Sequence, residues 1–435
     1  MLNSIIEKYK RSPLIQRFAG GTVWSFLAGL VNNLVFLLIG LILSHMLGKY
    51  LYGQYGMVRS TINMFIAFSS FALGTTTTKY VAQYRFVDKQ KTERIINLSL
   101  FVASLLALTV FIICLISANY IALQTLHTPS LTVPVRIASW MVLFLTISGV
   151  VNGVLIGYEE FFLIFKQNLI SACLLIVCST LCSWLFKLNG ALIGLLVYLF
   201  AFMYLGMYYL CKIYKREGLR FSFREIGKEL TILWRFSLPA TLGGLVYTPV
   251  IWLTNTILVN SPAGYGAMAG LDIIRQWYSA VLFIPTIAGR VVLPMLSNLC
   301  NQTESRSYNK VLMYSLFVNV GTAILIGLLL YLFSPILFSM YGTVFSDLKH
   351  PFGIMLIVAV IFVGNSIVGQ IILSKNYAWW GFLFNSIWAT VFIFLNIYFV
   401  KNHTMGILGV TFSYLISYLL HSIVQIIFCC FILKK

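Results

Sequence analysis

Apolar runs of roughly 20 residues or more follow one another along the whole sequence, with short polar segments between them. A run of about 20 apolar residues is what an α-helix needs to cross the hydrocarbon core of a bilayer. Of the 435 residues, 60% are hydrophobic and 9% are charged, whereas about a quarter of a soluble domain is charged. The sequence therefore predicts an all-α integral membrane protein and excludes an ordinary soluble domain.

The apolar runs predict twelve transmembrane helices joined by short loops. The seventh run contains Pro239, Gly243, Gly244 and Pro249, so it is expected to bend or partly unwind. The fifth and sixth runs are separated only by residues 187–190. The predicted spans cover about residues 22–47, 57–81, 95–117, 137–157, 169–186, 191–211, 236–259, 267–289, 311–333, 352–373, 378–400 and 407–433.

The positions of lysine and arginine orient these predicted helices. The chain has 30 of these residues and a formal net charge of +19. Most of them fall in the N-terminal tail, in alternate loops and at the C-terminus, and few fall in the other loops. This is the positive-inside pattern, so both termini are expected to be cytoplasmic. The same pattern argues against a nucleic-acid partner, because the basic residues lie between apolar runs and not on one soluble face.

The longest polar stretch lies at the middle of the chain and predicts two halves. We expect a cytoplasmic amphipathic tail over residues 1–21, a six-helix lobe over 22–211, a basic cytoplasmic connector over 212–235 and a second six-helix lobe over 236–435. Within the connector, residues 223–230 are expected to form an interfacial helix. Two pseudo-symmetric lobes around a central cavity are an architecture of transporters in which one lobe rocks against the other.

A glycine segment recurs in the two halves. Residues 53–56 (Gly-Gln-Tyr-Gly) match residues 264–266 (Gly-Tyr-Gly), and both are expected to form turns between spans. The span after the first turn carries Arg59, and the span after the second carries Asp272 and Arg275. A charged residue near the bilayer centre costs about 2.5–3.5 kcal/mol on insertion scales, so such residues usually face a partner or a water-filled path.

These three charged residues support two interpretations. Asp272 and Arg275 are three residues apart on one helical face, so they can form an internal ion pair that only makes the helix insertable. Alternatively, one or both face a cavity and contact a substrate or a coupling ion. Arg59 has no evident partner in its own helix, which favours a shared cationic patch.

A cationic patch would suit an anionic, phosphate-bearing ligand. Guanidinium groups bind phosphate oxygens bidentately and stay charged when they are removed from water. The predicted substrate-binding residues are Arg59, Arg275, Asp272, Arg290, Gln276 and Asn33. His421, which lies in the middle of the last span, is a candidate for ion coupling together with Asp272, or else a buried hydrogen-bonded histidine.

The sequence lacks the motifs that are typical of several classes of function. The chain has no GxxxxGK[ST] motif for nucleotide hydrolysis and no paired-carboxylate or Ser/His/Asp arrangement on one side of the membrane, so we expect no catalytic residues. Its eight cysteines include no CxxC pair, and most lie within apolar runs, so we expect no metal site. No cofactor is expected, and an enzyme is disfavoured.

The sequence resembles bacterial polysaccharide-repeat-unit flippases, which belong to the multidrug/oligosaccharidyl-lipid/polysaccharide exporter superfamily. The similar segments are residues 24–48, 52–56, 236–239 and 293–297. The resemblance implies translocation of undecaprenyl-pyrophosphate-linked oligosaccharide from the inner to the outer leaflet of the bacterial cytoplasmic membrane, by alternating access through a cationic central cavity. It also implies a role in O-antigen, lipopolysaccharide, capsule or exopolysaccharide assembly, with membrane lipid, a polysaccharide polymerase and a chain-length regulator as partners.

Two other branches of the superfamily fit the sequence less well. Peptidoglycan-precursor flippases usually have 14 spans and more arginines in the first helix, whereas this chain has no arginine between Gly20 and Arg59. Multidrug exporters carry an acidic residue in the first span, where this chain has Asn32 and Asn33. An ion-coupled multidrug or small-molecule exporter stays open as the alternative function.

Overall fold

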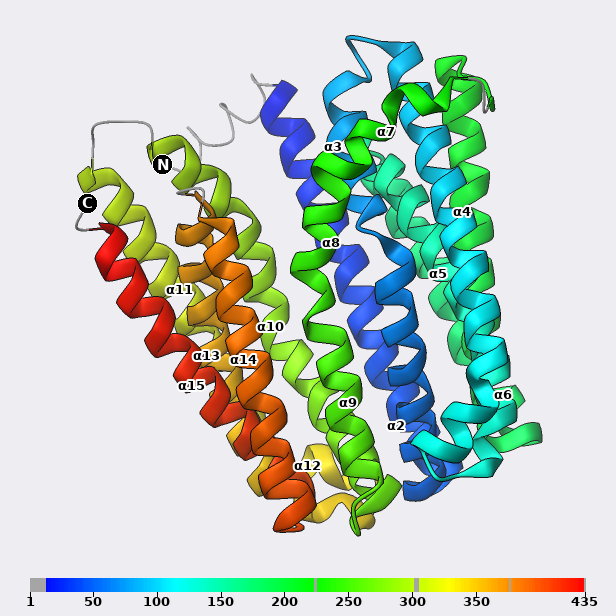
Figure 1. The fold of residues 1–435 in the computed structure, drawn as a ribbon, viewed down its shortest axis with the longest axis vertical. Helices are drawn as coiled ribbons and strands as arrows, with labels where there is room; N and C mark the ends of the chain where they lie inside the picture. The colour runs from blue at the N-terminus through cyan, green and yellow to red at the C-terminus, as the bar shows by residue number, and fades with distance from the viewer. Residues whose placement is uncertain (1–12, 223–224, 301–304, 375–376, 434–435) are drawn as a thin grey trace. The chain divides into compact units, whose positions relative to one another are not determined.

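A computed structural model describes residues 13–222, 225–300, 305–374 and 377–433. Its described residues form helices and connecting turns, and no strand occurs among them (Figure 1). The helices are α2 (Pro13–Ser70), α3 (Leu73–Tyr84), α4 (Lys89–Tyr120), α5 (Thr132–Gly157), α6 (Phe161–Glu217), α7 (Leu230–Ile232), α8 (Leu238–Leu245), α9 (Tyr247–Val259), α10 (Gly264–Cys300), α11 (Ser305–Leu332), α12 (Ser334–Ser339), α13 (Lys349–Ser374), α14 (Ala378–Asn396) and α15 (Gly406–Leu433).

Within the described residues, eight helical stretches are long and apolar enough to cross a membrane. Two of them, Gly21–Ser70 and Phe161–Glu217, have 50 and 57 residues, more than twice the length that a bilayer core of about 30 Å needs. Each is interrupted by one non-helical residue, Gly48 (φ 70°, ψ 173°) or Lys187 (φ 48°, ψ −122°). The all-α, multi-span membrane architecture is thus confirmed, whereas the number of twelve crossings and the side on which the termini lie stay predictions.

The turn predicted over residues 48–56 is confirmed only at Gly48, and the glycine segment at residues 53–56 is helical. Only Gly48 leaves the helical conformation, and the following residues continue as part of α2. A positive φ at this position suits glycine, which has no Cβ to clash with the backbone.

The prediction of one helix over residues 57–81 is wrong. Phe71 and Ala72 adopt positive φ angles of 41° and 47°, and α3 begins at Leu73.

The predicted interruption of the seventh run is confirmed. Helix α8 ends at Leu245 and α9 begins at Tyr247, with Pro249 in the first turn of α9, where proline removes no intrahelical hydrogen bond.

The expected interfacial helix over 223–230 is replaced by a short 3-10 segment, Ile226–Glu229. Residues 223–224 lie outside the described part of the chain, as do residues 1–12 of the predicted tail.

Packing divides the chain into two compact units. Unit 1 comprises Met1–Ile39, Thr61–Leu123 and Thr128–Leu245, and unit 2 comprises Gly40–Ser60, Gln124–His127 and Val246–Lys435. In unit 1, α4 packs on α5 and α5 packs on α6. In unit 2, α10, α11, α13 and α15 pack together, and α14 lies along α15 (Figure 1). Residues 40–60 therefore pack with the C-terminal part of the chain; the predicted lobes at 22–211 and 236–435 stay a prediction.

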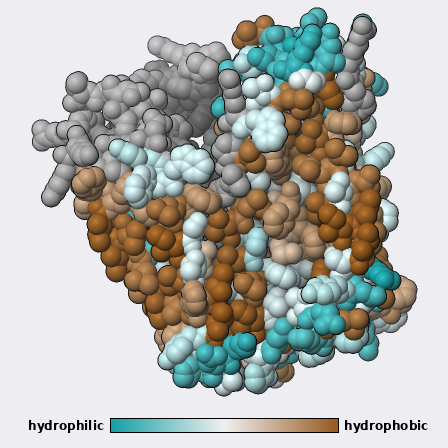
Figure 2. Space-filling view, in the orientation of Figure 1, coloured by the Kyte–Doolittle hydropathy of each residue, from teal (hydrophilic) through white to brown (hydrophobic). Residues whose placement is uncertain are grey.

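The surface of the helices matches a lipid environment. Figure 2 shows hydrophobic side chains over the middle of the visible helices and hydrophilic side chains gathered toward helix ends. Large apolar residues such as Ile116, Trp184 and Phe317 have exposed fractions of 77–81%. Such extensive exposure of apolar side chains is unfavourable in water and is ordinary where lipid chains cover the helix.

Candidate substrate-binding site

Two glycines of α2 allow this helix to lie directly against α10 within unit 2. A Cβ atom at Gly53 would overlap the backbone carbonyl of Tyr265, and one at Gly56 would overlap the carboxylate of Asp272. Small residues permit this close approach between helices in membranes. The glycine segment predicted as a turn is therefore a helix-packing surface, and it places residues 52–59 beside residues 265–276.

Arg59 lies on this surface and contacts its own helix. The guanidinium carbon of Arg59 is 5.4 Å from the centroid of the Tyr55 ring, one helical turn earlier. Cations bind aromatic faces at such distances because the ring quadrupole is negative there. Arg59 also interacts electrostatically with Asp272. The prediction that Arg59 has no partner in its own helix is thus wrong, because Tyr55 lies directly beneath it.

Arg275 is held by hydrogen bonds from other helices of unit 2. Its guanidinium donates to Asn255 Oδ1 at 2.9 Å and to the Tyr414 hydroxyl at 3.2 Å. Asn255 Nδ2 in turn donates to Ser60 Oγ at 2.7 Å. The chain Ser60–Asn255–Arg275–Tyr414 links α2, α9, α10 and α15, so Arg275 is fixed in position by neutral partners.

Asp272 is the carboxylate of this cluster. It interacts electrostatically with both Arg59 and Arg275. Among the described residues, the hydrogen bonds of the Arg275 guanidinium go to Asn255 and Tyr414, not to Asp272. Two arginines and one aspartate give a formal charge of +1, and each of the three side chains remains partly exposed. We call Tyr55, Arg59, Asp272, Arg275 and their hydrogen-bonding partners the cationic cluster.

Gln276 ties α10 to α2 beside the cationic cluster. Its Nε2 donates to the hydroxyl of the fully buried Tyr52 at 2.7 Å. Its side chain occupies the space left open at Gly40, where a Cβ atom would overlap the amide. The Oε1 atom is buried without a hydrogen-bond partner among the described residues. Gln276 therefore has a packing role, in addition to its predicted role in binding.

Three other predicted residues are not part of the described cluster. Asn33 lies in unit 1, where its Nδ2 donates to the carbonyl of Gly29 in the same helix at 3.0 Å. The backbone of Arg290 belongs to α10, but its side chain lies outside the described part. His421 is a buried residue of α15, and neither ring nitrogen has a hydrogen-bond partner among the described residues. Its proposed role in ion coupling stays a prediction.

Aromatic side chains surround the Tyr414 partner of Arg275. The Tyr414 ring lies parallel to that of Tyr418, with centroids 6.2 Å apart, and packs against Phe392 at 4.4 Å. Trp388 packs against Tyr418 and stacks on Tyr247 at 5.7 Å. The spacing of four between Tyr414 and Tyr418 is visible in the sequence, but the distance to Arg275 depends on tertiary structure.

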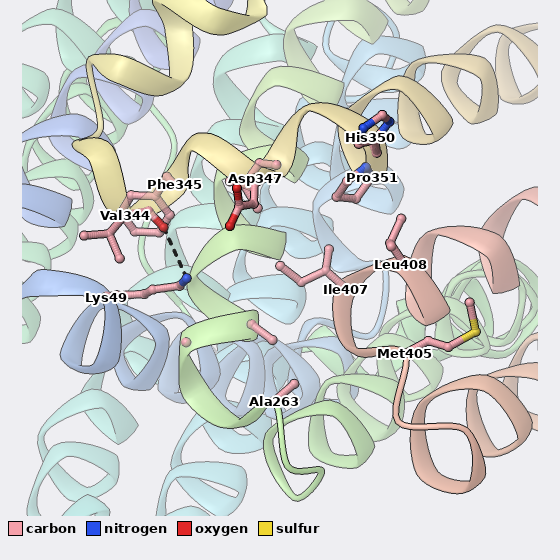
Figure 3. Close-up of a pocket in the computed structure, with 13 residues that line it drawn as sticks. Lys49, Ala263, Val344, Phe345, Asp347, His350, Pro351, Met405, Ile407 and Leu408 are labelled. Carbon is pink, nitrogen blue, oxygen red and sulfur yellow. Dashed lines mark hydrogen bonds between the residues drawn. The ribbon is translucent and has the colours of Figure 1, made fainter.

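A separate cavity of about 450 Å³ lies where several helices of unit 2 begin and end (Figure 3). Lys49 donates to the carbonyl of Val344 at 3.2 Å, and Asp347 and His350 also line the cavity. It does not include the cationic cluster.

Among the described residues, no group of three or more His, Cys, Asp or Glu side chains is placed to hold a metal ion.

The sequence matches the profile of a family described as Polysaccharide biosynthesis protein over residues 18–300. The chain belongs to this family. The matched residues of this polysaccharide biosynthesis protein include Tyr55, Arg59, Asn255, Asp272 and Arg275, so most of the cationic cluster lies within the family region.

Curated relatives of this polysaccharide biosynthesis protein include the EPS I polysaccharide export inner membrane protein EpsE from Ralstonia nicotianae, 24% identical over 183 residues. EpsE from Ralstonia solanacearum is 25% identical over 174 residues. The first alignment covers 41% of this chain and 41% of the relative, and the second covers 38% of each. The family match thus shows membership of the polysaccharide biosynthesis family, and the chain aligns with less than half the length of these two relatives.

Solved transporters share the fold of this polysaccharide biosynthesis protein. A multidrug resistance MATE family transporter of the MOP superfamily, in an inward-facing conformation, gives a TM-score of 0.79 at 16% identity and 94% coverage of both chains. An outward-facing MATE transporter gives 0.71 at 14% identity, covering 98% of this chain and 97% of that one. A MOP superfamily transporter from Pyrococcus furiosus gives 0.69 at 16% identity and 95% coverage of both chains. The fold is that of MATE-like transporters.

Proposed function

We propose that this protein is a flippase that moves undecaprenyl-pyrophosphate-linked oligosaccharide units from the inner to the outer leaflet of a bacterial cytoplasmic membrane. The cycle would be alternating access, since solved transporters of this fold include inward-facing and outward-facing conformations. The units would serve surface polysaccharide assembly, such as O-antigen, capsule or exopolysaccharide. A polymerase and a chain-length regulator would be the downstream partners.

The observation that carries the proposal is the excess positive charge of the cationic cluster. Arg59 and Arg275 share one carboxylate, Asp272, and their other described partners include the neutral groups of Tyr55, Asn255 and Tyr414. Positive charge within membrane-spanning helices is unfavourable unless it faces a ligand, an anion or water. A diphosphate carries the opposite charge and offers oxygens that guanidinium groups bind bidentately.

The positions of the arginines also suit a lipid carrier. Arg275 is oriented by two hydrogen bonds, whereas Arg59 rests on an aromatic ring of its own helix. A positioned guanidinium can bind one phosphate of the diphosphate, and Arg59 can bind the other. Because Asp272 lies close to both arginines, it would weaken their attraction for the diphosphate. The lipid could then be released on the other side of the membrane.

A second candidate is an ion-coupled exporter of drugs or other small molecules. The structural similarity to multidrug MATE transporters and the half-buried carboxylate of Asp272 favour it. A carboxylate can bind a proton or a cationic drug, but the excess positive charge of the cationic cluster would repel cations. Uptake of ethidium into proteoliposomes, driven by a proton or sodium gradient, would support this function over the first.

The proposed function can be tested with purified protein in proteoliposomes. The substrate is a fluorescent undecaprenyl-pyrophosphate disaccharide, and a membrane-impermeant quencher measures its movement between leaflets. We expect rapid movement with the wild type and at least tenfold slower movement with Arg59→Ala or Arg275→Ala. The matched control is Arg136→Ala, which removes an exposed arginine of α5. Equal rates for all four proteins would overturn the proposed role of the cationic cluster.

A further inference from the structure

The cavity that contains Lys49 lies where three long helices of unit 2 begin. Helix α10 begins at Gly264, α13 at Lys349 and α15 at Gly406. Helices α13 and α15 have 26 and 28 residues, or about 40 Å at 1.5 Å per residue, so their ends extend beyond a hydrocarbon core of about 30 Å into the headgroup region. We call this space of about 450 Å³ the helix-start cavity, because first-turn residues of all three helices line it (Figure 3): Gly266, Ala267, His350, Pro351, Ile407 and Leu408.

Lys49 supplies a positioned positive charge to the helix-start cavity. Its ammonium group donates to the carbonyl of Val344 at 3.2 Å and lies 5.7 Å from the centroid of the Phe345 ring. An ammonium group has three donors, and Val344 takes one of them, so the others can serve a ligand. The first turns of the three helices add partial positive charge, because their N–H groups have no intrahelical acceptor. This part of the cavity favours a phosphate group.

Asp347 supplies the opposite charge to the same cavity. Its side chain is exposed, and among the described residues its carboxylate accepts one hydrogen bond, from the Ser346 hydroxyl at 3.4 Å. The ion pairs of the described part of the chain do not join Asp347 to Lys49. The two side chains together have a formal charge of zero, so each would repel a ligand that carries only its own sign. A ligand with one charge of each sign satisfies both.

Apolar side chains form much of the remaining wall. Leu348, Met405, Ile407 and Leu408 line the cavity, and Met405 is 38% exposed. A small soluble zwitterion would leave these side chains in contact with water, whereas the glycerol and acyl chains of a lipid would cover them. The combination of both charges with this apolar wall favours a zwitterionic phospholipid.

The contacts of Asp347 and Phe345 indicate which cationic group such a lipid carries. A carboxylate accepts hydrogen bonds, which a primary ammonium group can donate and a quaternary one cannot. Quaternary ammonium groups are recognised by the faces of aromatic rings, but the Phe345 ring is buried and the Lys49 ammonium lies over it. A primary ammonium group therefore fits the helix-start cavity better than a choline group.

We propose that the helix-start cavity binds the headgroup of a phospholipid with a primary ammonium group, as in phosphatidylethanolamine. The phosphate lies at Lys49 and the ammonium group at Asp347. This lipid is a bound component of the membrane and not the transported substrate, so the inference does not depend on the proposed function. Phosphatidylglycerol has no cation for Asp347, and phosphatidylcholine has no N–H donor for it, so both bind less tightly.

The test measures lipid binding to the full-length purified protein in detergent by native mass spectrometry. The probes are phosphatidylethanolamine, phosphatidylcholine and phosphatidylglycerol with identical acyl chains. We expect phosphatidylethanolamine to bind about three- to tenfold more tightly than either of the others, since its ammonium adds charge-assisted hydrogen bonds. Asp347→Asn should bring phosphatidylethanolamine and phosphatidylglycerol within twofold of each other, and Lys49→Gln should weaken the binding of phosphatidylethanolamine at least threefold.

Matched controls remove the same charges outside the cavity. Lys349→Gln removes an exposed lysine at the start of α13, whose ammonium lies 5.6 Å from the Tyr331 ring, and Glu225→Gln removes an exposed carboxylate that pairs with Lys228 in unit 1. Both should keep the order of the three lipids. The melting temperature in lipid-free detergent separates loss of the fold from loss of binding.

Two results would overturn the inference. One is equal affinity of the wild type for phosphatidylethanolamine and phosphatidylglycerol, or an unchanged preference in a folded Asp347→Asn variant. The other is displacement of bound phosphatidylethanolamine by an equal concentration of soluble glycerophosphoethanolamine, which would mean that the cavity takes the free headgroup and not the lipid.

Discussion

Arginines in two regions of this molecule have different kinds of partner. In the polar segments of unit 1, arginines meet nearby carboxylates. The pairs are Arg85 with Glu159, Arg94 with Glu229 at 3.1 Å, and Arg216 with Glu160 and with Glu217 at 2.9 Å. Each of these three guanidinium groups has at least one carboxylate partner, and the contacts are those of ordinary structural ion pairs.

The cationic cluster of unit 2 differs because Arg59 and Arg275 share a single aspartate. The described hydrogen bonds of Arg275 go to the neutral groups of Asn255 and Tyr414, and Arg59 rests on the Tyr55 ring. Neutral partners orient a guanidinium without cancelling its charge. We therefore infer that the ion pairs of unit 1 stabilise the structure, and we propose that the cationic cluster binds an anion.

Reversing one charge of the cationic cluster should have the largest effect on transport. Arg275→Glu changes the formal charge of the cationic cluster from +1 to −1 and places two carboxylates near each other. Each charge-assisted hydrogen bond contributes about 1.5–3 kcal/mol, so its loss together with repulsion should reduce transport by at least a hundredfold. The proteoliposome assay measures the rate, and membrane insertion is checked by detergent extraction and gel filtration. Transport above a tenth of the wild-type rate would contradict the expectation.

Separating α2 from α10 should have the next largest effect. Gly53→Ala introduces a methyl group that overlaps the Tyr265 carbonyl, and overpacking of this kind costs about 1–3 kcal/mol. We expect a lower thermal melting temperature in detergent and slower transport. The control is Gly321→Ala in α11, where a Cβ atom would meet no atom within 4 Å. Equal melting temperatures for the two variants would mean that α2 does not rely on this contact.

Removing the shared carboxylate should strengthen the binding of a diphosphate. Asp272→Asn raises the formal charge of the cationic cluster to +2 with little change in shape. We expect undecaprenyl diphosphate to bind several-fold more tightly, because two guanidinium groups now lack their nearby anion, and to be released more slowly. Native mass spectrometry gives the affinity and the quenching assay gives the rate. Weaker binding would mean that Asp272 contacts the ligand directly or orders the arginines.

Removing an arginine of unit 1 should have the smallest effect. Arg216 is 54% exposed on its side chain, and exposed ion pairs contribute about 0–1 kcal/mol. Arg216→Gln should therefore leave transport within about twofold of the wild type and lower the melting temperature slightly at most. A loss of transport comparable to that of Arg275→Ala would erase the distinction between the two regions.

The charged residues of the site could be predicted from the sequence because their cost in a membrane is large. Arg59, Asp272 and Arg275 stand out in apolar runs, and the structure places all three in unit 2. The spacing of Tyr52, Tyr55 and Arg59 would also have indicated one helical face. The partners Asn255 and Tyr414 could not be predicted, since they come from helices whose contacts with α10 depend on tertiary packing.

The glycine segment shows why the turn prediction failed. Gly53 and Gly56 have the composition of a turn, but in a membrane helix glycine also allows another backbone to approach. Both uses look alike in one sequence, and only the position of Tyr265 and Asp272 distinguishes them.

The most direct test of the central claim is the affinity for undecaprenyl diphosphate of three proteins at one ionic strength. They are the wild type, the double variant Arg59→Gln/Arg275→Gln and the control variant Arg216→Gln. We expect at least a hundredfold weaker binding to the double variant, since two charge-assisted contacts are lost, and binding within twofold for the control. Equal affinity of the double variant and the wild type would contradict the claim that the cationic cluster binds the diphosphate.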